Sequence, residues 1–189
     1  MPDLDVDGSV FSFPDGWEVS KYDEWAYFKN VLEKIVDPNG RGLHGCDIVA
    51  LDGSRLWLIE AKDYAYREAR VPQNLVAIVA EKVIDTLAGL HSGAKNEHDH
   101  QDFCHRAVHM SRLGVALRID LPGAQPNANK MAKEAAIKAM ADYQQEFRQV
   151  LKRVFNDGVY VVTGREDDAV VPWTVEWGEG ARAAHMRTR

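Results

Sequence analysis

The stretch DIVALDGSRLWLIEAK, residues 47 to 62, decides the fold of this chain. Two runs rich in Val, Ile and Leu lie on either side of the polar segment DGSR, residues 52 to 55. Apolar runs of this length, separated by a short segment that contains glycine, predict two antiparallel strands joined by a hairpin turn. We expect the strands at about residues 45 to 51 and 55 to 63.

The hairpin turn determines which side chains share a face of the sheet. Gly53 and Ser54 fit the centre of a type II′ turn, and a four-residue loop gives the same pairing, with Asp47 opposite Glu60. A type I′ turn centred one residue earlier places Asp47 diagonal to Glu60, still on the same face. Because strand side chains alternate, Lys62 joins Glu60 on that face. The sequence thus predicts two carboxylates and an ammonium group close together.

The rest of the chain alternates helical and strand patterns after an irregular start. Apolar residues at helical spacing predict a first helix from about 20 to 36, with Trp25, Phe28, Leu32 and Ile35 inward. Further elements are expected in this order: a helix opened by Pro72, a short helix within 91 to 110, a strand at 114 to 119, a helix at 129 to 155 with Met140, Tyr143, Phe147, Leu151 and Val154 inward, a strand at 159 to 163 and another at 173 to 177. This order predicts an α/β or α+β domain with a mixed sheet flanked by helices.

The bulk properties favour a single soluble domain. The 189 residues suit one domain of ordinary size, and the composition is close to that of globular proteins. A net charge of -6 argues against a protein that coats nucleic acid through bulk positive charge. Two cysteines are too few for a disulfide framework, and neither a signal peptide nor an apolar run that spans a bilayer is evident. We expect a cytoplasmic protein with reduced thiols and no membrane partner.

The opposed carboxylates predict a bound cation. Two like charges that face each other across a sheet are destabilising unless something neutralises them. Mg²⁺ or Mn²⁺ prefers carboxylate oxygens, waters and phosphate oxygens, and Asp47, Glu60 and the carbonyl of Ala61 supply such ligands. The ion would activate a water, and Lys62 would orient that water or stabilise developing charge. The alternative is that these are strand-end residues in solvent, with Lys62 as an ordinary ion-pair partner; the apolar face on which they lie favours function.

The spacing of Asp47 and Glu60-Ala61-Lys62 resembles the PD-(D/E)XK nuclease superfamily. In that family an acidic residue on one strand is followed, after a variable gap, by Asp or Glu, any residue and Lys on the next. The resemblance implies a restriction-endonuclease-like core at about residues 20 to 163, with a C-terminal extension at 164 to 189, all in one domain. Many members also place a glutamate near the metal on the first helix, where Glu24 matches. Cys46 stands where the family has a proline, which has no chemical role.

The resemblance implies a Mg²⁺-dependent endonuclease that acts on nucleic acid, with DNA favoured. Asp47 and Glu60 would be metal ligands, Lys62 would act in catalysis, and Glu24 would assist the metal. One small active site cuts one strand at a time, so double-strand cleavage would require a homodimer. The alternative is a catalytically inactive nuclease-fold module that binds nucleic acid or a protein partner in a larger complex, and the acidic net charge favours it.

Three further features leave alternatives open. Lys82 and Gln73, on the expected second helix, either reach the carboxylates or lie in solvent. His105 and His109 have the i, i+4 spacing that can hold Zn²⁺, but the crowded histidines of residues 91 to 110 match no standard zinc spacing. Between residues 130 and 153, six basic residues outnumber three acidic ones. This helix face either contacts phosphates or is simply solvated. The basic residues are Lys130, Lys133, Lys138, Arg148, Lys152 and Arg153, and the acidic residues are Glu134, Asp142 and Glu146.

Overall fold

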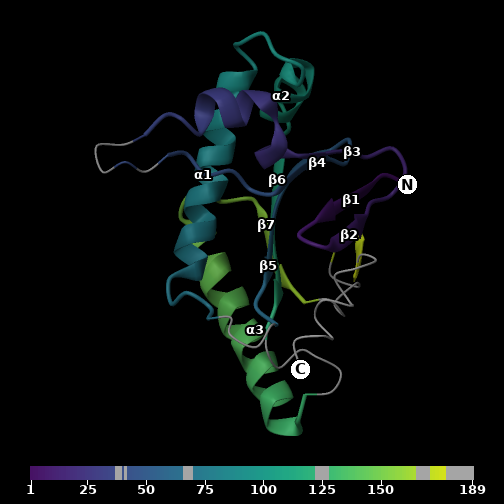
Figure 1. Ribbon diagram of the computed structural model, residues 1–189, viewed down its shortest axis with the longest axis vertical. Helices are drawn as coiled ribbons and strands as arrows, with labels where there is room; N and C mark the ends of the chain where they lie inside the picture. The colour runs from purple at the N-terminus through teal and green to yellow at the C-terminus, as the bar shows by residue number, and fades with distance from the viewer. Residues whose placement is uncertain (37–39, 41, 66–69, 122–127, 165–170, 178–189) are drawn as a thin grey trace.

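A five-stranded mixed sheet forms the centre of the fold (Figure 1). Its strand order is β3-β4-β5-β6-β7, with bounds Glu18–Lys21, Ile48–Leu51, Arg55–Asp63, Arg112–Asp120 and Val159–Thr163. β3, β4 and β5 pair antiparallel, whereas β5, β6 and β7 run parallel. The computed structural model describes residues 1–36, 40, 42–65, 70–121, 128–164 and 171–177. The expected α+β class with a mixed sheet is confirmed.

The β4–β5 hairpin has the register predicted from its turn. Leu51 pairs with Leu56 and Ile48 pairs with Ile59, so the loop spans residues 52 to 55. Gly53 has a φ of 88°, which a residue with a side chain rarely adopts. The glycine therefore permits the tight turn, and the type I′ alternative centred one residue earlier does not occur.

The carboxylate of Asp52 holds this turn together. Its Oδ1 accepts hydrogen bonds from the backbone N–H of Ser54 at 2.8 Å, the hydroxyl of Ser54 at 2.9 Å and the backbone N–H of Arg55 at 2.7 Å. Its Oδ2 accepts from the indole N–H of Trp57 at 3.0 Å. An aspartate that bonds to the backbone two and three residues later stabilises a turn without other parts of the chain.

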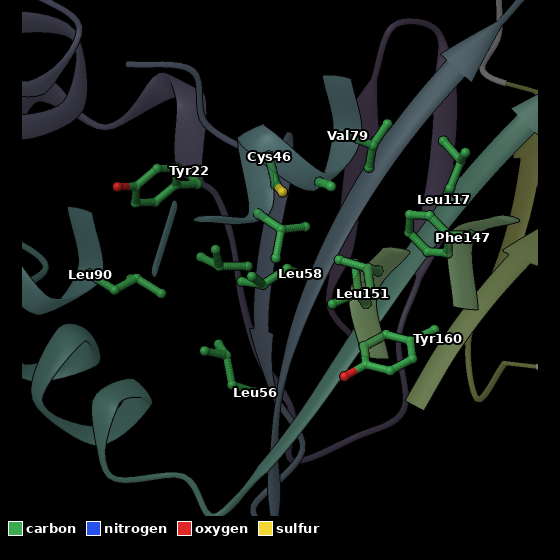
Figure 2. Packing of buried hydrophobic residues seen from close by; sticks show 14 of the residues in the cluster. Tyr22, Cys46, Leu56, Leu58, Val79, Leu90, Leu117, Phe147, Leu151 and Tyr160 are labelled. Carbon is green, nitrogen blue, oxygen red and sulfur yellow. The ribbon is translucent and has the colours of Figure 1, made fainter. Parts of the chain in front are cut away.

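Two helices cover one face of the central sheet. α1 (Leu75–Gly93) connects β5 to β6, and α3 (Lys130–Lys152) connects β6 to β7. Both lie on the same side of the sheet in Figure 1, and α2 (Gln101–Val108) packs near the end of α1. Figure 2 shows how their apolar side chains meet those of the strands, among them Leu58, Val79, Leu117, Phe147 and Leu151.

A small antiparallel sheet covers the opposite face. It has the order β1-β2-β8, with bounds Asp3–Val6, Ser9–Ser12 and Thr174–Trp177. Phe11, Phe13 and Trp173 are buried in a second core together with Trp57 and Ile59 of β5. β8 lies in the expected C-terminal extension, of which residues 165–170 and 178–189 are outside the described residues. The extension thus completes a sheet with the N-terminal hairpin, which was expected from the sequence to be irregular.

The expected first helix at 20 to 36 is wrong. Residues 18 to 21 form β3, followed by a 3₁₀ turn at Tyr22–Glu24 and a π-helical turn at Phe28–Leu32. Sheet pairing extends to the backbone N–H of Tyr22, which donates to the carbonyl of Asp47 at 3.0 Å. Pairing with β4 therefore outweighs the helical pattern of side chains. Trp25, Phe28 and Leu32 are buried as predicted, whereas Ile35 is 54% exposed.

α3 also protects an edge of the central sheet. In the part of the chain that the structure describes, β7 is an edge strand, so its outer N–H and C=O groups have no neighbouring strand there. The side chain of Gln144 donates to the carbonyl of Tyr160 at 3.0 Å and accepts from the N–H of Val162 at 2.8 Å. This amide therefore replaces one step of a strand pairing. Val154, expected to face inward near the end of α3, is 49% exposed instead.

No helix among the described residues is long and apolar enough to cross a membrane. Both cysteines are buried and unpaired, as expected.

Candidate functional site

Four charged side chains from three segments meet beside the apolar core. Asp47 directly precedes β4, Glu60 and Lys62 lie on β5, and Lys82 lies on α1. The pairing of Ile48 with Ile59 places Asp47 opposite Glu60, on the face predicted from the hairpin. The Oδ2 atom of Asp47 accepts a hydrogen bond from the backbone N–H of Ala61 at 2.7 Å, which fixes the carboxylate against β5. We call Asp47, Glu60, Lys62 and Lys82 the charged cluster.

Glu60 is the centre of the charged cluster. Its side chain has 0% exposure, and its Oε1 atom lies 2.5 Å from Nζ of Lys62 and 2.6 Å from Nζ of Lys82. Both ammonium groups are also 3.8 Å from Asp47. The two positive charges balance the two negative ones when all four groups are ionised. The opposed carboxylates therefore do not require a metal ion for neutralisation, contrary to the expectation from the sequence.

The position of Lys82 settles whether this side chain reaches the carboxylates or lies in solvent. It projects from α1 toward β5 and contacts the buried carboxylate, with its own side chain 19% exposed. Gln73, in contrast, is exposed before the first turn of α1. The sequence did not distinguish these two residues, because the distance between α1 and β5 depends on how the helix packs. Helical spacing gives a partial signal, since Lys82 lies three residues after the buried Val79.

Burial and charge act in opposite directions on the ionisation of the charged cluster. Burial raises the pKa of Glu60 and the nearby Asp47 raises it further, while Lys62 and Lys82 oppose this shift. Burial lowers the pKa of Lys62, but Glu60 and Asp47 outweigh it, so the net pKa of Lys62 is raised. Lys62 therefore stays protonated at neutral pH. The Oε2 atom of Glu60 is buried and has no hydrogen-bond partner in the described part of the chain.

Glu24, expected near the metal, points to a different partner, and its neighbour Asp23 is partly buried. The side chain of Glu24 is 57% exposed and pairs with Lys21 at 3.1 Å. Burial raises the pKa of Asp23, and the second cause is the charge of Asp47. Glu24, in contrast, has no contact with the charged cluster among the described residues. The role expected for Glu24 stays a prediction.

The donor atoms of the charged cluster fit a hard divalent cation. Glu60 contributes a buried oxygen without a donor, and the carbonyl of Ala61 already accepts a hydrogen bond from Lys62 at 3.0 Å. No group of three or more His, Cys, Asp or Glu side chains gathers to hold a metal among the residues that the structure describes. A Mg²⁺ ion needs only one or two carboxylates when waters and phosphates complete its shell. Mg²⁺ or Mn²⁺ at Asp47 and Glu60 therefore stays a prediction.

The histidine-rich segment is organised by ring stacking. His98 stacks on Tyr27 with centroids 4.3 Å apart, and His100 stacks on Trp25 at 4.1 Å. The Nδ1 atom of His98 accepts the backbone N–H of His100 at 3.2 Å. Because Nδ1 is an acceptor, Nε2 carries the proton and donates to the carbonyl of Gly93 at 3.2 Å. Both ring nitrogens of His98 are therefore engaged in hydrogen bonds.

His105 and His109 have the i, i+4 spacing considered above for a zinc site. Nδ1 of His109 lies 2.6 Å from the carbonyl oxygen of His105, and both side chains are exposed. The bond to the carbonyl places a proton on Nδ1 of His109 and leaves its Nε2 atom with a lone pair, the arrangement that histidine ligands of metals commonly have. No group of three or more His, Cys, Asp or Glu side chains that could hold a metal gathers among the residues that the structure describes, so zinc at these histidines stays an open alternative. The stacked rings of the segment pack against Trp25, which is 3% exposed.

Comparison with known proteins gives one match. The chain is 28% identical, over an aligned length of 214 residues, to a protein of Neisseria meningitidis serogroup A named cysteine–tRNA ligase. The alignment covers 95% of this chain and 30% of that protein, so the chain spans less than a third of the length of its relative. No family model and no solved structure matches. The resemblance to the PD-(D/E)XK superfamily accordingly stays a prediction.

The relative overturns the expected activity. The sequence predicted a Mg²⁺-dependent DNA endonuclease, or an inactive module of nuclease fold. The match is to a ligase and not to a hydrolase, so the nuclease assignment is wrong. Lys62 and Lys82 also balance the charge of the carboxylates, so charge balance alone does not call for a metal. An acidic pair followed by Glu-x-Lys is too short a pattern to define a reaction.

Proposed function

We propose that this chain is an RNA-binding domain related to part of an aminoacyl-tRNA ligase. One observation carries the proposal: nearly the whole chain, 95%, aligns with a protein named for tRNA. Because the alignment covers 30% of that protein, the proposal concerns binding of RNA and leaves the joining of cysteine to tRNA to the relative. Transfer RNA is therefore the first ligand to test.

The charged cluster supplies donors that suit a phosphate group. An ammonium group has three N–H donors. Lys62 uses two of them on Glu60 and Ala61, and Lys82 uses one on Glu60, by the contacts of the described residues. Their side chains are 26% and 19% exposed, so the remaining donors can meet a ligand at the surface. Charge-assisted hydrogen bonds to phosphate oxygens are among the stronger contacts that a protein makes with RNA.

The test is binding of fluorescent tRNA, followed by anisotropy, to wild type and to a Lys62→Gln/Lys82→Gln variant that circular dichroism shows to be folded at the temperature of the experiment. Without two charge-assisted hydrogen bonds, binding should weaken by about tenfold or more, since about 1.4 kcal/mol corresponds to tenfold. A Lys34→Gln/Lys95→Gln variant changes the net charge equally at two exposed positions and should bind like wild type. A wild type that binds no tRNA contradicts the proposal, and equal weakening in both variants removes the charged cluster from it.

We also propose that Mg²⁺ or Mn²⁺ binds at Asp47 and Glu60. The buried Oε2 atom of Glu60, which lacks a donor, supports this assignment. When bound, the ion would supply positive charge for a phosphate oxygen at the charged cluster. Titration with Mn²⁺, followed by electron paramagnetic resonance, should show one site that is lost in Asp47→Asn and kept in Asp99→Asn, a change at an exposed carboxylate. Equal Mn²⁺ binding in both variants would contradict the site.

Two further experiments test whether the protein also binds DNA and whether it forms a homodimer, as the sequence predicted. DNA of equal length, added as a competitor, separates recognition of RNA from general attraction to phosphates. Sedimentation of the free protein and of its complex gives the number of chains in each. A monomer that binds RNA fits the proposal, because no step of it requires two copies of the charged cluster.

A further inference from the structure

α3 has a line of exposed side chains along its full length. Seven positions follow one another at steps of three or four residues, which places them on one side of a helix. All seven are exposed: Lys130, Glu134, Lys138, Ala141, Gln145, Arg148 and Lys152. We call these seven residues the basic line. The opposite side of α3, with Ala136, Phe147 and Leu151, is buried against the core.

The charge of the basic line differs from that of the whole chain. It contains four basic residues and one acidic residue, a net +3, in a chain with a net charge of -6. Lys130 and Glu134 are 3.8 Å apart, with side chains 89% and 64% exposed, a separation at which solvent screens most of their attraction. Asp142 lies four residues after Lys138 and borders the basic line, so that the net charge of this side is +2 when Asp142 is counted, whereas Glu146 lies off the line by its spacing. Positive charge is thus gathered on one side of the helix.

The geometry gives the basic line a long and open surface. Its first and last members are 22 residues apart, which at 1.5 Å per residue corresponds to about 33 Å. In Figure 1 the N-terminal part of α3 extends beyond the central sheet, and Met131 and Ile137 in this part are 81% and 71% exposed. Near the other end, Nε of Arg148 donates to the carbonyl of Tyr160 at 3.4 Å. The guanidinium is therefore partly held, and its remaining donors have no hydrogen-bond partner within the described ranges, so they can meet a ligand.

We propose that the basic line is a docking surface for the sugar–phosphate backbone of RNA. The inference rests on the proposed RNA binding and names the surface that makes the extended contact. A polyanion repeats its charge along its length, and a straight row of cations on an otherwise acidic protein is complementary to it. The charged cluster offers donors for a single phosphate, whereas the basic line is long enough for several. An acidic protein segment is the competing ligand.

The experiment measures how tRNA affinity depends on salt. The line variant carries Lys130→Gln, Lys138→Gln, Arg148→Gln and Lys152→Gln. The control variant carries Lys34→Gln, Arg70→Gln, Lys95→Gln and Arg112→Gln, four exposed basic residues outside α3. Both variants change the net charge equally, and circular dichroism melting checks that each remains folded.

The line variant should lower the slope of log affinity against log salt by about 0.7 to 0.9 for each phosphate that the protein no longer neutralises. The control variant should keep the wild-type slope. Equal slopes in the two variants, with tRNA still bound by wild type, overturn the basic line alone. A wild type without tRNA binding overturns the proposed function and the inference together. Tighter binding of a polyglutamate peptide than of tRNA assigns the basic line to an acidic protein partner and also overturns the inference.

Discussion

Glu60 is a carboxylate without solvent exposure on a strand that otherwise has an apolar face toward α1. Such a group needs partners, because an unpaired buried charge is costly. Lys62 comes from the same strand, so the sequence alone placed it correctly. Lys82 comes from a helix, and its distance from Glu60 depends on helix packing that no local pattern encodes. At the residue scale, three members of the charged cluster were predictable and the fourth was an open alternative.

Removal of both lysines should destabilise the fold. In a Lys62→Met/Lys82→Met variant, Glu60 keeps its burial but loses both cations, and breaking such a buried pairing costs about 3–5 kcal/mol. Unfolding by urea at pH 7 measures this loss. A further Glu60→Met change should recover part of it, because the fully buried carboxylate is replaced by an apolar group, while Asp47 keeps its hydrogen bond from the backbone of Ala61. If stability falls further in the triple variant, the ion pairs are not the cause.

The same lysine variant should respond to pH in a defined direction. Burial and Asp47 raise the pKa of Glu60, and removal of the opposing lysines raises it further. Below the ordinary value of 4.5, Glu60 is protonated in both the folded and unfolded states, and burial of its charge costs nothing. The cost appears as pH rises through the raised pKa. The deficit of the variant relative to wild type should therefore be smaller at pH 4 than at pH 8, and a constant deficit in urea unfolding would contradict this assignment.

At the element scale, the hairpin of β4 and β5 was predictable because its determinants are local. A glycine with positive φ, an aspartate that accepts from the turn and two apolar runs fix its register within 16 residues. β2 is different, since its partner β8 lies more than 160 positions later in the sequence. The helix predicted for residues 20 to 36 does not form, because pairing of β3 with β4 determines the backbone conformation at the start of this segment. Local patterns predict local pairings and miss those between distant segments.

Asp52→Ala should weaken the hairpin, because several donors of the turn lose their acceptor. The expected loss is about 1–3 kcal/mol in the free energy of unfolding, and Ser54→Ala, which removes only one of these bonds, should lose less.

Burial tends to raise the pKa of Asp52, but the donors of Ser54, Trp57 and Arg55 outweigh it and lower the net pKa. A lowered pKa gives stability that is present above pH 3.8 and is lost as pH falls through the folded-state pKa. The deficit of Asp52→Ala in urea unfolding should shrink from pH 7 to pH 3, and a deficit that grows would contradict the turn assignment.

Gln144→Ala should uncover the edge of β7. The change leaves the carbonyl of Tyr160 and the N–H of Val162 without this side-chain partner, at a cost of about 1–3 kcal/mol. Gln145→Ala, on the exposed side of the same helix, controls for the change in helix composition. Hydrogen exchange should be faster at Val162 in the first variant only. Equal stability of the two variants would show that the edge is satisfied in another way.

At the scale of the whole molecule, the two ends of the described chain close the fold together. β1 and β2 come from the first 12 residues and β8 from residues 174 to 177, and they cover the face of the central sheet that carries Trp57. The sequence predicted the strand at 173 to 177 but assigned it to an extension outside the core. Its place depends on Phe13, Trp17 and Trp173, which meet only in the folded molecule.

Trp173→Ala tests this closure. The indole is 2% exposed, and its ring centroid lies 5.0 Å from that of Trp57 and 5.7 Å from that of Phe13. Truncation of a buried aromatic side chain costs about 3–5 kcal/mol. Thermal unfolding should show a large drop in Tm, and a dye that binds apolar surface should bind more strongly. A variant with unchanged Tm would show that the small sheet adds little to the stability of the central one.

The function of the whole molecule was the least predictable feature. The sequence placed the carboxylates and Lys62 on one face, yet an acidic pair with Glu-x-Lys on a mixed sheet does not specify what the site acts on. The match to a tRNA ligase over nearly the whole chain, and not the site geometry, replaces DNA cleavage with RNA binding as the proposed function. The basic line on α3 is the surface that we propose for this binding on an acidic protein.

Competition binding tests the central claim most directly. Fluorescent tRNA is bound to the wild-type protein at low salt and then displaced by unlabelled tRNA or by DNA of the same length. We predict that tRNA displaces the label and that DNA requires a clearly higher concentration. The absence of any tRNA binding, or displacement by DNA at the same concentration as by tRNA, would contradict the claim that this chain is an RNA-binding domain.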